Sequence, residues 1–182
     1  TIQDRDVYLI KTDAGGALEW SRSWDLDPGD RDMASDMIVT SDGFILLACI
    51  QSMDSGLISS SAIKLDMLGN EIWRKPFVRG EVGAEFWDVM EDSDGGYVFS
   101  GIVFNSIDRM TGRIKGDGWI VKTDREGNLL WESVVRHEDY GEMLLSAAVL
   151  MSESEYLFVG ATTPTNEIYS DILWLKIKEP KE

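Results

Sequence analysis

One short stretch is written three times along this chain: an apolar run, then Lys, Asp, a turn with Gly, and Trp. It reads LIKTDAGGALEW at 9–20, AIKLDMLGNEIW at 62–73 and IVKTDREGNLLW at 120–131. The lysine recurs once more in DILWLKIK, so Lys11, Lys64, Lys122 and Lys176 follow one another at 53, 58 and 54 residues. A period of this length indicates a repeat architecture in which each repeat is one supersecondary unit.

A second signature lies between these stretches. Each copy has a polar turn before an apolar run: VTSDGFILLA at 39–48, EDSDGGYVFSG at 91–101 and LMSESEYLFVG at 150–160. Asp-Gly between two such runs predicts a tight β-hairpin. The apolar runs lack polar alternation, which is typical of a sheet covered on both faces. Each unit therefore resolves into four short strands.

The repeated stretch itself predicts a hairpin. An Asp that starts a turn stands three residues before a Gly that accepts a left-handed backbone, in the pairs Asp13–Gly16, Asp66–Gly69 and Asp124–Gly127. A Trp follows seven residues after each Asp, on the returning strand, at Trp20, Trp73 and Trp131. We expect these large rings to cover the neighbouring sheet, so that these glycines and tryptophans have structural roles.

Four-stranded units with this period predict an all-β, β-propeller-like domain over residues 1–182. The repeat units are about 6–61, 62–116, 117–170 and a partial unit at 171–182. A β-sandwich is the rival fold, but its strands alternate apolar and polar residues more cleanly. Thirteen strands are expected, in groups of two, four, four and three, which is about three four-stranded blades plus a spare strand. Either another chain completes the ring or the sequence is part of a longer propeller, because propellers typically have at least four blades.

The pattern D-x-W-(apolar)₂-K-T-D-x-x-G-N-x-x-W resembles the Trp-anchored propeller repeats of bacterial and archaeal surface and secreted proteins. These repeats are related in blade style to quinoprotein-type (PQQ-like) repeats. The segments DGWIVKTDREGNLLW (117–131) and EDSDGGYVFSG (91–101) are close matches, whereas Ser59 replaces the leading Asp of the second copy. The resemblance implies a propeller and an extracellular, cell-surface or periplasmic location, with a cytoplasmic one as the alternative. It implies no particular activity, because such scaffolds carry unrelated ones.

Composition narrows the range of partners. The formal net charge is −16, from 33 acidic and 17 basic residues, so nucleic acid and anionic membrane surfaces are disfavoured. No apolar stretch reaches the length of a membrane span, so membrane insertion is not expected. The single Cys49 lies in the apolar run FILLACI and is expected to be buried rather than reactive. A protein partner, or self-association that completes the propeller, is the expected form of interaction.

In a propeller, the loops between fourth and first strands share one face with the loops between second and third strands. They are expected at 24–33, 77–86 and 135–143, and at 51–60, 105–117 and 163–170. Their chemistry-bearing residues are the candidate ligand- or partner-binding residues, because loops on a rigid scaffold commonly carry recognition. These residues are Asp27, Asp30, Asp32, Arg79, Glu81, Arg109, Arg113 and His137.

Two of these loops invite a chemical interpretation. Alternating Asp27, Asp30 and Asp32 could supply oxygen ligands for calcium, although the spacing departs from the EF-hand loop and a solvated acidic turn is favoured. His137, the only histidine, could take part in acid–base catalysis, but it lacks the companions of a metal site, and an exposed loop residue is favoured. We therefore expect no catalytic residue, no cofactor and no metal beyond this calcium candidate.

The function favoured by the sequence is a non-catalytic β-propeller scaffold or a ligand- or protein-binding module. The first alternative is an enzyme, a lyase or hydrolase, whose site forms on the loop face of a completed ring. The second alternative is a structural subunit that assembles through open blade edges, since unpaired edges otherwise promote aggregation.

Overall fold

The computed structural model of this chain describes residues 5–108, 110, 113–164, 167 and 169–179. These residues form thirteen β-strands and no helix. The predicted all-β class is therefore confirmed. No helix suited to crossing a membrane occurs in the described part of the chain.

The strands fall into four successive groups, which we name the first to the fourth sheet. The first sheet contains β1 (Val7–Thr12) and β2 (Leu18–Trp24). The second contains β3 (Arg31–Thr40), β4 (Gly43–Gln51), β5 (Ile58–Asp66) and β6 (Glu71–Phe77). The third contains β7 (Ala84–Glu91), β8 (Tyr97–Asp108), β9 (Arg113–Thr123) and β10 (Leu129–Val135). The fourth contains β11 (Tyr140–Ser152), β12 (Glu155–Pro164) and β13 (Asp171–Lys178).

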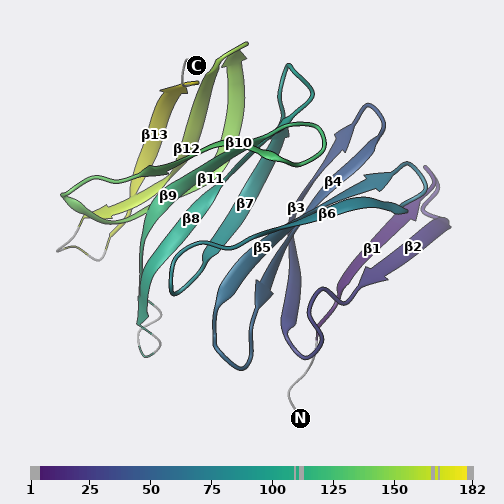
Figure 1. Cartoon of the computed structure of the whole chain (residues 1–182), viewed down its shortest axis with the longest axis horizontal. Helices are drawn as coiled ribbons and strands as arrows, with labels where there is room; N and C mark the ends of the chain where they lie inside the picture. The colour runs from purple at the N-terminus through teal and green to yellow at the C-terminus, as the bar shows by residue number, and fades with distance from the viewer. Residues whose placement is uncertain (1–4, 109, 111–112, 165–166, 168, 180–182) are drawn as a thin grey trace.

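Within each group, consecutive strands pair antiparallel in chain order. One parallel pair, Glu142 with Gly116, connects the third and fourth sheets, so that their seven strands are continuously hydrogen-bonded. We keep separate names for these two groups of strands. The groups follow one another across the molecule, with β1 and β2 at one end and β13 at the other (Figure 1). No strand pairing connects the first group to the fourth within the described ranges. The observed groups of two, four, four and three strands coincide with the expected ones.

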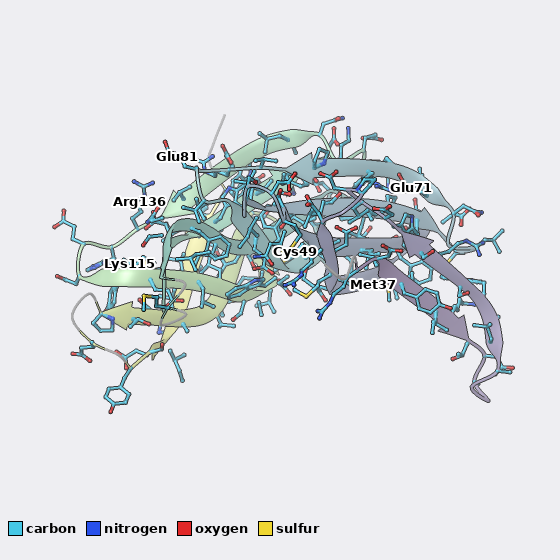
Figure 2. The ribbon with its side chains drawn as sticks, turned by 90° about the horizontal axis from the view of Figure 1, so that it is seen from below. Met37, Cys49, Glu71, Glu81, Lys115 and Arg136 are labelled. Atoms are coloured by element: carbon cyan, nitrogen blue, oxygen red, sulfur yellow. The ribbon has the colours of Figure 1, made fainter. Side chains whose placement is uncertain are left out.

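The core consists of apolar clusters between successive sheets. Leu46 of β4 packs toward the first sheet with Val7, whereas its neighbours Ile45 and Leu47 pack toward the third sheet with Phe86. A central strand therefore buries both of its faces, which explains its unbroken apolar sequence. Cys49 is buried within the same strand, and Figure 2 shows it inside the molecule. Burial raises the pKa of its thiol, so the thiolate is disfavoured.

The first strand of each of the last three sheets carries a β-bulge. The register shifts between Ala34 and Asp36 in β3, between Phe86 and Asp88 in β7, and between Leu145 and Ala147 in β11. A bulge re-aims the side chains beside it. Two of these side chains, Asp36 and Asp88, reach the next sheet, as described below.

Candidate functional site

The loops expected at 24–33, 51–60 and 77–86 lie together, whereas most of the residues expected in a loop at 105–117 belong to β8 and β9. A bridge between Ile58 and Gly83 links the second-to-third-strand loop of one sheet to the entry of the next. The backbone N–H of Met53 donates to Oδ1 of Asp30 at 2.8 Å, which joins the two loop sets within the second sheet. We name these connected segments the loop surface: residues 25–30, 52–57, 78–83 and 136–139.

The carboxylates of Asp30 and Asp32 accept hydrogen bonds from backbone N–H groups, and Asp32 lies in β3 rather than in the expected loop. Asp30 donates its N–H to the Asp27 carbonyl at 3.0 Å, and Oδ2 of Asp32 accepts from the N–H of Leu26 at 2.6 Å. Asp32 is buried, and this burial raises the pKa of its carboxyl group. Among the described residues, no three His, Cys, Asp or Glu side chains form a group that could hold a metal ion. The calcium site stays a prediction from sequence alone.

Arg79 and Glu81 lie on the loop between β6 and β7. Arg79 forms an ion pair with Oε1 of Glu132, whose Oε2 accepts from the indole N–H of Trp119 at 3.0 Å. Glu81 is exposed and lines a hollow of about 480 Å³ together with Arg79 and Arg136. Figure 2 shows Glu81 and Arg136 at the surface on the same side of the molecule. This part of the loop surface thus presents both charges.

The remaining loop candidates are His137, Arg109 and Arg113. The Nδ1 atom of His137 accepts from the N–H of Asp139 at 3.3 Å, and its ring centroid is 5.0 Å from that of Tyr140. The imidazole is more than half exposed. Arg109 lies outside the described residues, and Arg113 opens β9 with its side chain likewise outside them. The prediction that these two arginines bind a ligand or partner is therefore untested.

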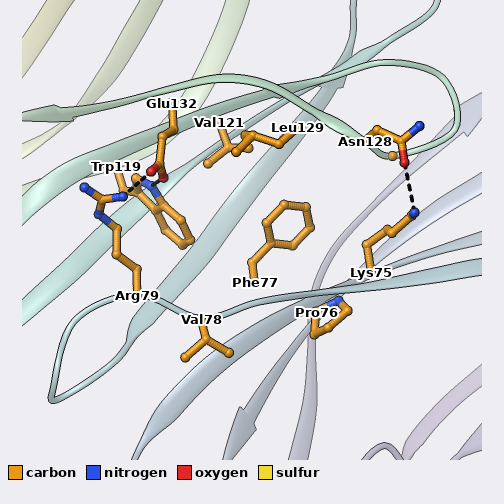
Figure 3. A pocket seen from close by; sticks show the side chains of 11 residues that line it. Lys75, Pro76, Phe77, Val78, Arg79, Trp119, Val121, Asn128, Leu129 and Glu132 are labelled. Carbon is orange, nitrogen blue, oxygen red and sulfur yellow. Dashed lines mark hydrogen bonds and ion pairs between the residues drawn. The ribbon is translucent and has the colours of Figure 1, made fainter.

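A groove of about 430 Å³ separates β6 from β10, the outermost strands of the second and third sheets (Figure 3). Phe77 and Trp119 line it, and Leu129 forms part of its wall. The Lys75 ammonium donates to the Asn128 side-chain carbonyl at 3.1 Å toward one end, as Figure 3 shows. The Arg79–Glu132 ion pair lies toward the other end. These polar contacts connect the two sheets across an apolar floor.

The repeated lysine has a role that its recurrence did not reveal. Lys64 is buried, and its Nζ donates to Oγ1 of Thr40 at 2.6 Å and to Oδ1 of Asp42 at 2.5 Å. It also lies 3.2 Å from the phenol oxygen of Tyr97, which belongs to the next sheet. The lysine therefore connects a hairpin turn of its own sheet with the following sheet.

The same arrangement recurs at the next junction. Lys122 forms ion pairs with the buried Asp92 and, at 2.9 Å, with Asp94. The Tyr156 hydroxyl of the fourth sheet donates to Oδ2 of Asp92 at 2.6 Å. Burial lowers the pKa of Lys122 and raises that of Tyr156 to about 12. At the two ends of the chain, Lys11 and Lys176 instead pair with Glu19 and Glu155 of their own sheets.

The predicted structural tryptophans lie at the same junctions. Their rings approach an aromatic ring of the following sheet, with centroid distances of 6.3 Å for Trp20–Phe44, 6.1 Å for Trp73–Tyr97 and 6.3 Å for Trp131–Tyr156. Gly127 adopts φ of +75°, and a Cβ there would lie 3.0 Å from Cη2 of Trp73. A Cβ added at Gly69 would meet Trp20 in the same way, whereas a Cβ added at Gly16 would lie in open space.

Two carboxylates that the sequence analysis did not single out also tie sheets together. Oδ2 of Asp36 accepts from the N–H of Val89 at 3.0 Å. Oδ2 of Asp88 accepts from the N–H of Ala148 at 2.8 Å. Both aspartates occupy the same place in their strands, ASDMIVT and FWDVMED, and this recurrence was the available signal.

The two ends of the molecule expose positions that are buried inside it. We name the face of a sheet toward the following sheet its forward face, and the opposite one its backward face. Ala62 and Ile120 stand two residues before a repeated lysine, on the forward face, and both are 0% exposed. Trp174 has the same position in the fourth sheet but is 70% exposed. Ile63 and Val121 stand one residue before a repeated lysine, on the backward face, and both are 0% exposed. Ile10 has the same position in the first sheet but is 52% exposed.

The two exposed end faces and the loop surface are therefore the candidate binding surfaces of the protein. A scan against protein-family models and a search of curated proteins find no match to this chain. The propeller-repeat resemblance therefore stays a prediction, and function has to be argued from the residues themselves.

Proposed function

We propose that this chain is a non-catalytic propeller-type scaffold that binds protein partners, including further copies of itself, through its two end faces. The observation that carries the proposal is the exposure of Trp174 and Ile10 at positions that are fully buried at the internal junctions. Contiguous exposed apolar surface of this kind marks interaction sites. Val149, Met151, Val159 and Ile172 accompany Trp174 in the fourth sheet, with exposures of 41% to 88%.

The two end faces are complementary rather than alike. At internal junctions, a forward face with Ile45 and Leu47 packs on a backward face with Phe99 and Trp119. The fourth sheet presents an uncovered forward face, and the first sheet an uncovered backward face with Tyr8 and Ile10. A contact between unlike faces is heterologous, so it continues from copy to copy and gives either a closed ring or an open filament. Head-to-tail assembly therefore follows from the same packing that joins the sheets within one chain.

The polar residues of the chain support a scaffold role. Lys64, Lys122 and Asp92 are buried in contacts that hold sheets together, and Asp36 and Asp88 bind backbone amides. These interactions fix the geometry of the sheets. The extracellular or cell-surface location belongs to the same proposal, and it rests on the resemblance to surface-protein repeats.

The experiment is light scattering of the purified chain over a wide range of protein concentration. We expect the mass to rise above the 20.4 kDa of one chain as concentration increases. Trp174→Glu should abolish the rise, because a charge on the forward face would be desolvated in the contact. Leu68→Glu is the matched control, since Leu68 is 64% exposed on a hairpin turn and should leave the rise unchanged. A constant monomer mass at every concentration would contradict the self-association.

A further inference from the structure

The strand β13 has one free edge. It pairs with β12 on one side, and no strand pairs with its other side in the described part of the chain. Its counterparts β1, β5 and β9 each pair on that side with a further strand, namely β2, β6 and β10. A free edge presents unpaired backbone N–H and C=O groups, to which another chain can add as a strand.

The three strands that fill this place elsewhere share one register. Each puts a Trp directly opposite the repeated lysine, in the pairs Trp20–Lys11, Trp73–Lys64 and Trp131–Lys122. Each also puts an apolar residue four positions later, in the pairs Trp24–Val7, Phe77–Ser60 and Val135–Gly118. Residues four apart lie on one face of a strand, so both apolar side chains point to the forward face.

The free edge of β13 carries the matching positions. Lys176 corresponds to the repeated lysine, so the Trp of an added strand would lie opposite it. The second apolar side chain of that strand would lie opposite Ile172. Ile172 is 88% exposed, and Trp174 between them is 70% exposed. An added strand of the same pattern would form cross-strand apolar pairs on this face and would cover both residues.

We propose that the free edge of β13 binds one extended strand of another protein, antiparallel, with a Trp opposite Lys176 and an apolar residue four positions later opposite Ile172. The site goes beyond the contact between end faces, because it uses the edge of the sheet. A second copy's β2 does not fit this place, since its pairing edge is already occupied by β1 and its Trp20 is already opposite Lys11.

The test uses a fluorescein-labelled peptide, GNLLWESVV, which repeats residues 127–135. Binding is followed by fluorescence anisotropy with the Ile10→Glu variant of this chain, whose backward face is blocked and whose β13 is unchanged. We expect saturable binding, weakened about tenfold when the peptide Trp is replaced by Ala, as for a large aromatic anchor at an interface. A scrambled peptide of the same composition should not bind.

The position of the peptide is then mapped with a photo-crosslinking residue next to its Trp. Crosslinks within residues 171–178 support the proposal. Crosslinks to β9 would mean that the peptide displaces β10, and they would overturn it. Absent or non-saturable binding would overturn it as well. These outcomes are independent of the chain's own mass in solution, so failure of the strand site and failure of head-to-tail assembly can be told apart.

Discussion

Asp88 in β7 accepts a hydrogen bond from the backbone N–H of Ala148 in β11, 2.8 Å away, and so ties the third sheet to the fourth. Burial raises the pKa of this carboxyl group to about 6, and the nearby Asp36 carboxylate adds to the rise. The folded-state pKa thus lies above the ordinary 3.8. The folded state therefore gains stability as pH falls from above 6 toward 4, and it loses this contribution as pH rises through 6.

We predict that Asp88→Asn makes the protein more stable than wild type at pH 7, because the substitution removes a charge whose burial is unfavourable. The gain should be only about 1 kcal/mol, since solvent screens part of that charge. The Asn side-chain oxygen can still accept from Ala148, and it carries no charge. Urea unfolding at pH 7, 6, 5 and 4 measures the difference, which should shrink to near zero at pH 4. A variant that is less stable than wild type at pH 7 would show that the ionised carboxylate is required.

The Tyr156 hydroxyl supplies a second prediction. Tyr156→Phe removes the donor to the buried Asp92 carboxylate and leaves the ring packing in place. We expect the free energy of unfolding to fall by about 1–2 kcal/mol, as for a buried hydrogen bond to a charged group. Tyr8→Phe is the control, because Tyr8 is 61% exposed and should change little. Equal stability of Tyr156→Phe and wild type would mean that this bond contributes nothing to the junction.

Two glycines form a matched pair that separates backbone strain from packing. Gly16 and Gly127 have positive φ of 84° and 75°, so alanine is strained at both. Only at Gly127 would the added Cβ meet the neighbouring Trp73. We expect Gly127→Ala to lose about 1–3 kcal/mol more stability than Gly16→Ala, the range for overpacking. Equal losses in thermal or urea unfolding would show that this hairpin does not pack closely on Trp73.

Trp73 and Trp174 test the contrast between internal and end positions. Trp73→Ala removes a ring packed against Tyr97 and should lower the free energy of unfolding by about 3 kcal/mol. Trp174→Ala removes a ring that is 70% exposed, and the change should stay within about 0.5 kcal/mol. A large loss for Trp174→Ala in dilute, monomeric protein would contradict its assignment to an uncovered face.

The order of the strands could be predicted because the period of the repeated lysine and the Asp-Gly turns are local signals. The hairpin turns depend on a left-handed glycine, and such positions can be recognised from sequence at Gly69 and Gly127. The apolar residues on both sides of β4 likewise predicted burial between two sheets. These features involve neighbours in sequence, or residues that repeat at a fixed interval.

The contacts between sheets could not be predicted in the same way. The bond from Asp88 to Ala148 spans 60 residues and depends on a bulge that re-aims the carboxylate. The buried contact of Lys64 with Tyr97 requires that the hairpin of one sheet faces the second strand of the next. Among the loop candidates, Asp30 and Asp32 proved to bind backbone amides, which sequence spacing alone does not distinguish from metal ligation. The exposure of Ile10 and Trp174 becomes informative only when compared with the same positions inside the molecule.

Binding between unlike end faces is tested most directly by mixing two variants. Ile10→Glu blocks the backward face and Trp174→Glu blocks the forward face, so each variant keeps one competent face. Each alone should remain at 20.4 kDa in light scattering, whereas an equimolar mixture should form a dimer of twice that mass and nothing larger. A mixture that stays monomeric at concentrations where the wild-type chain associates would contradict the head-to-tail contact.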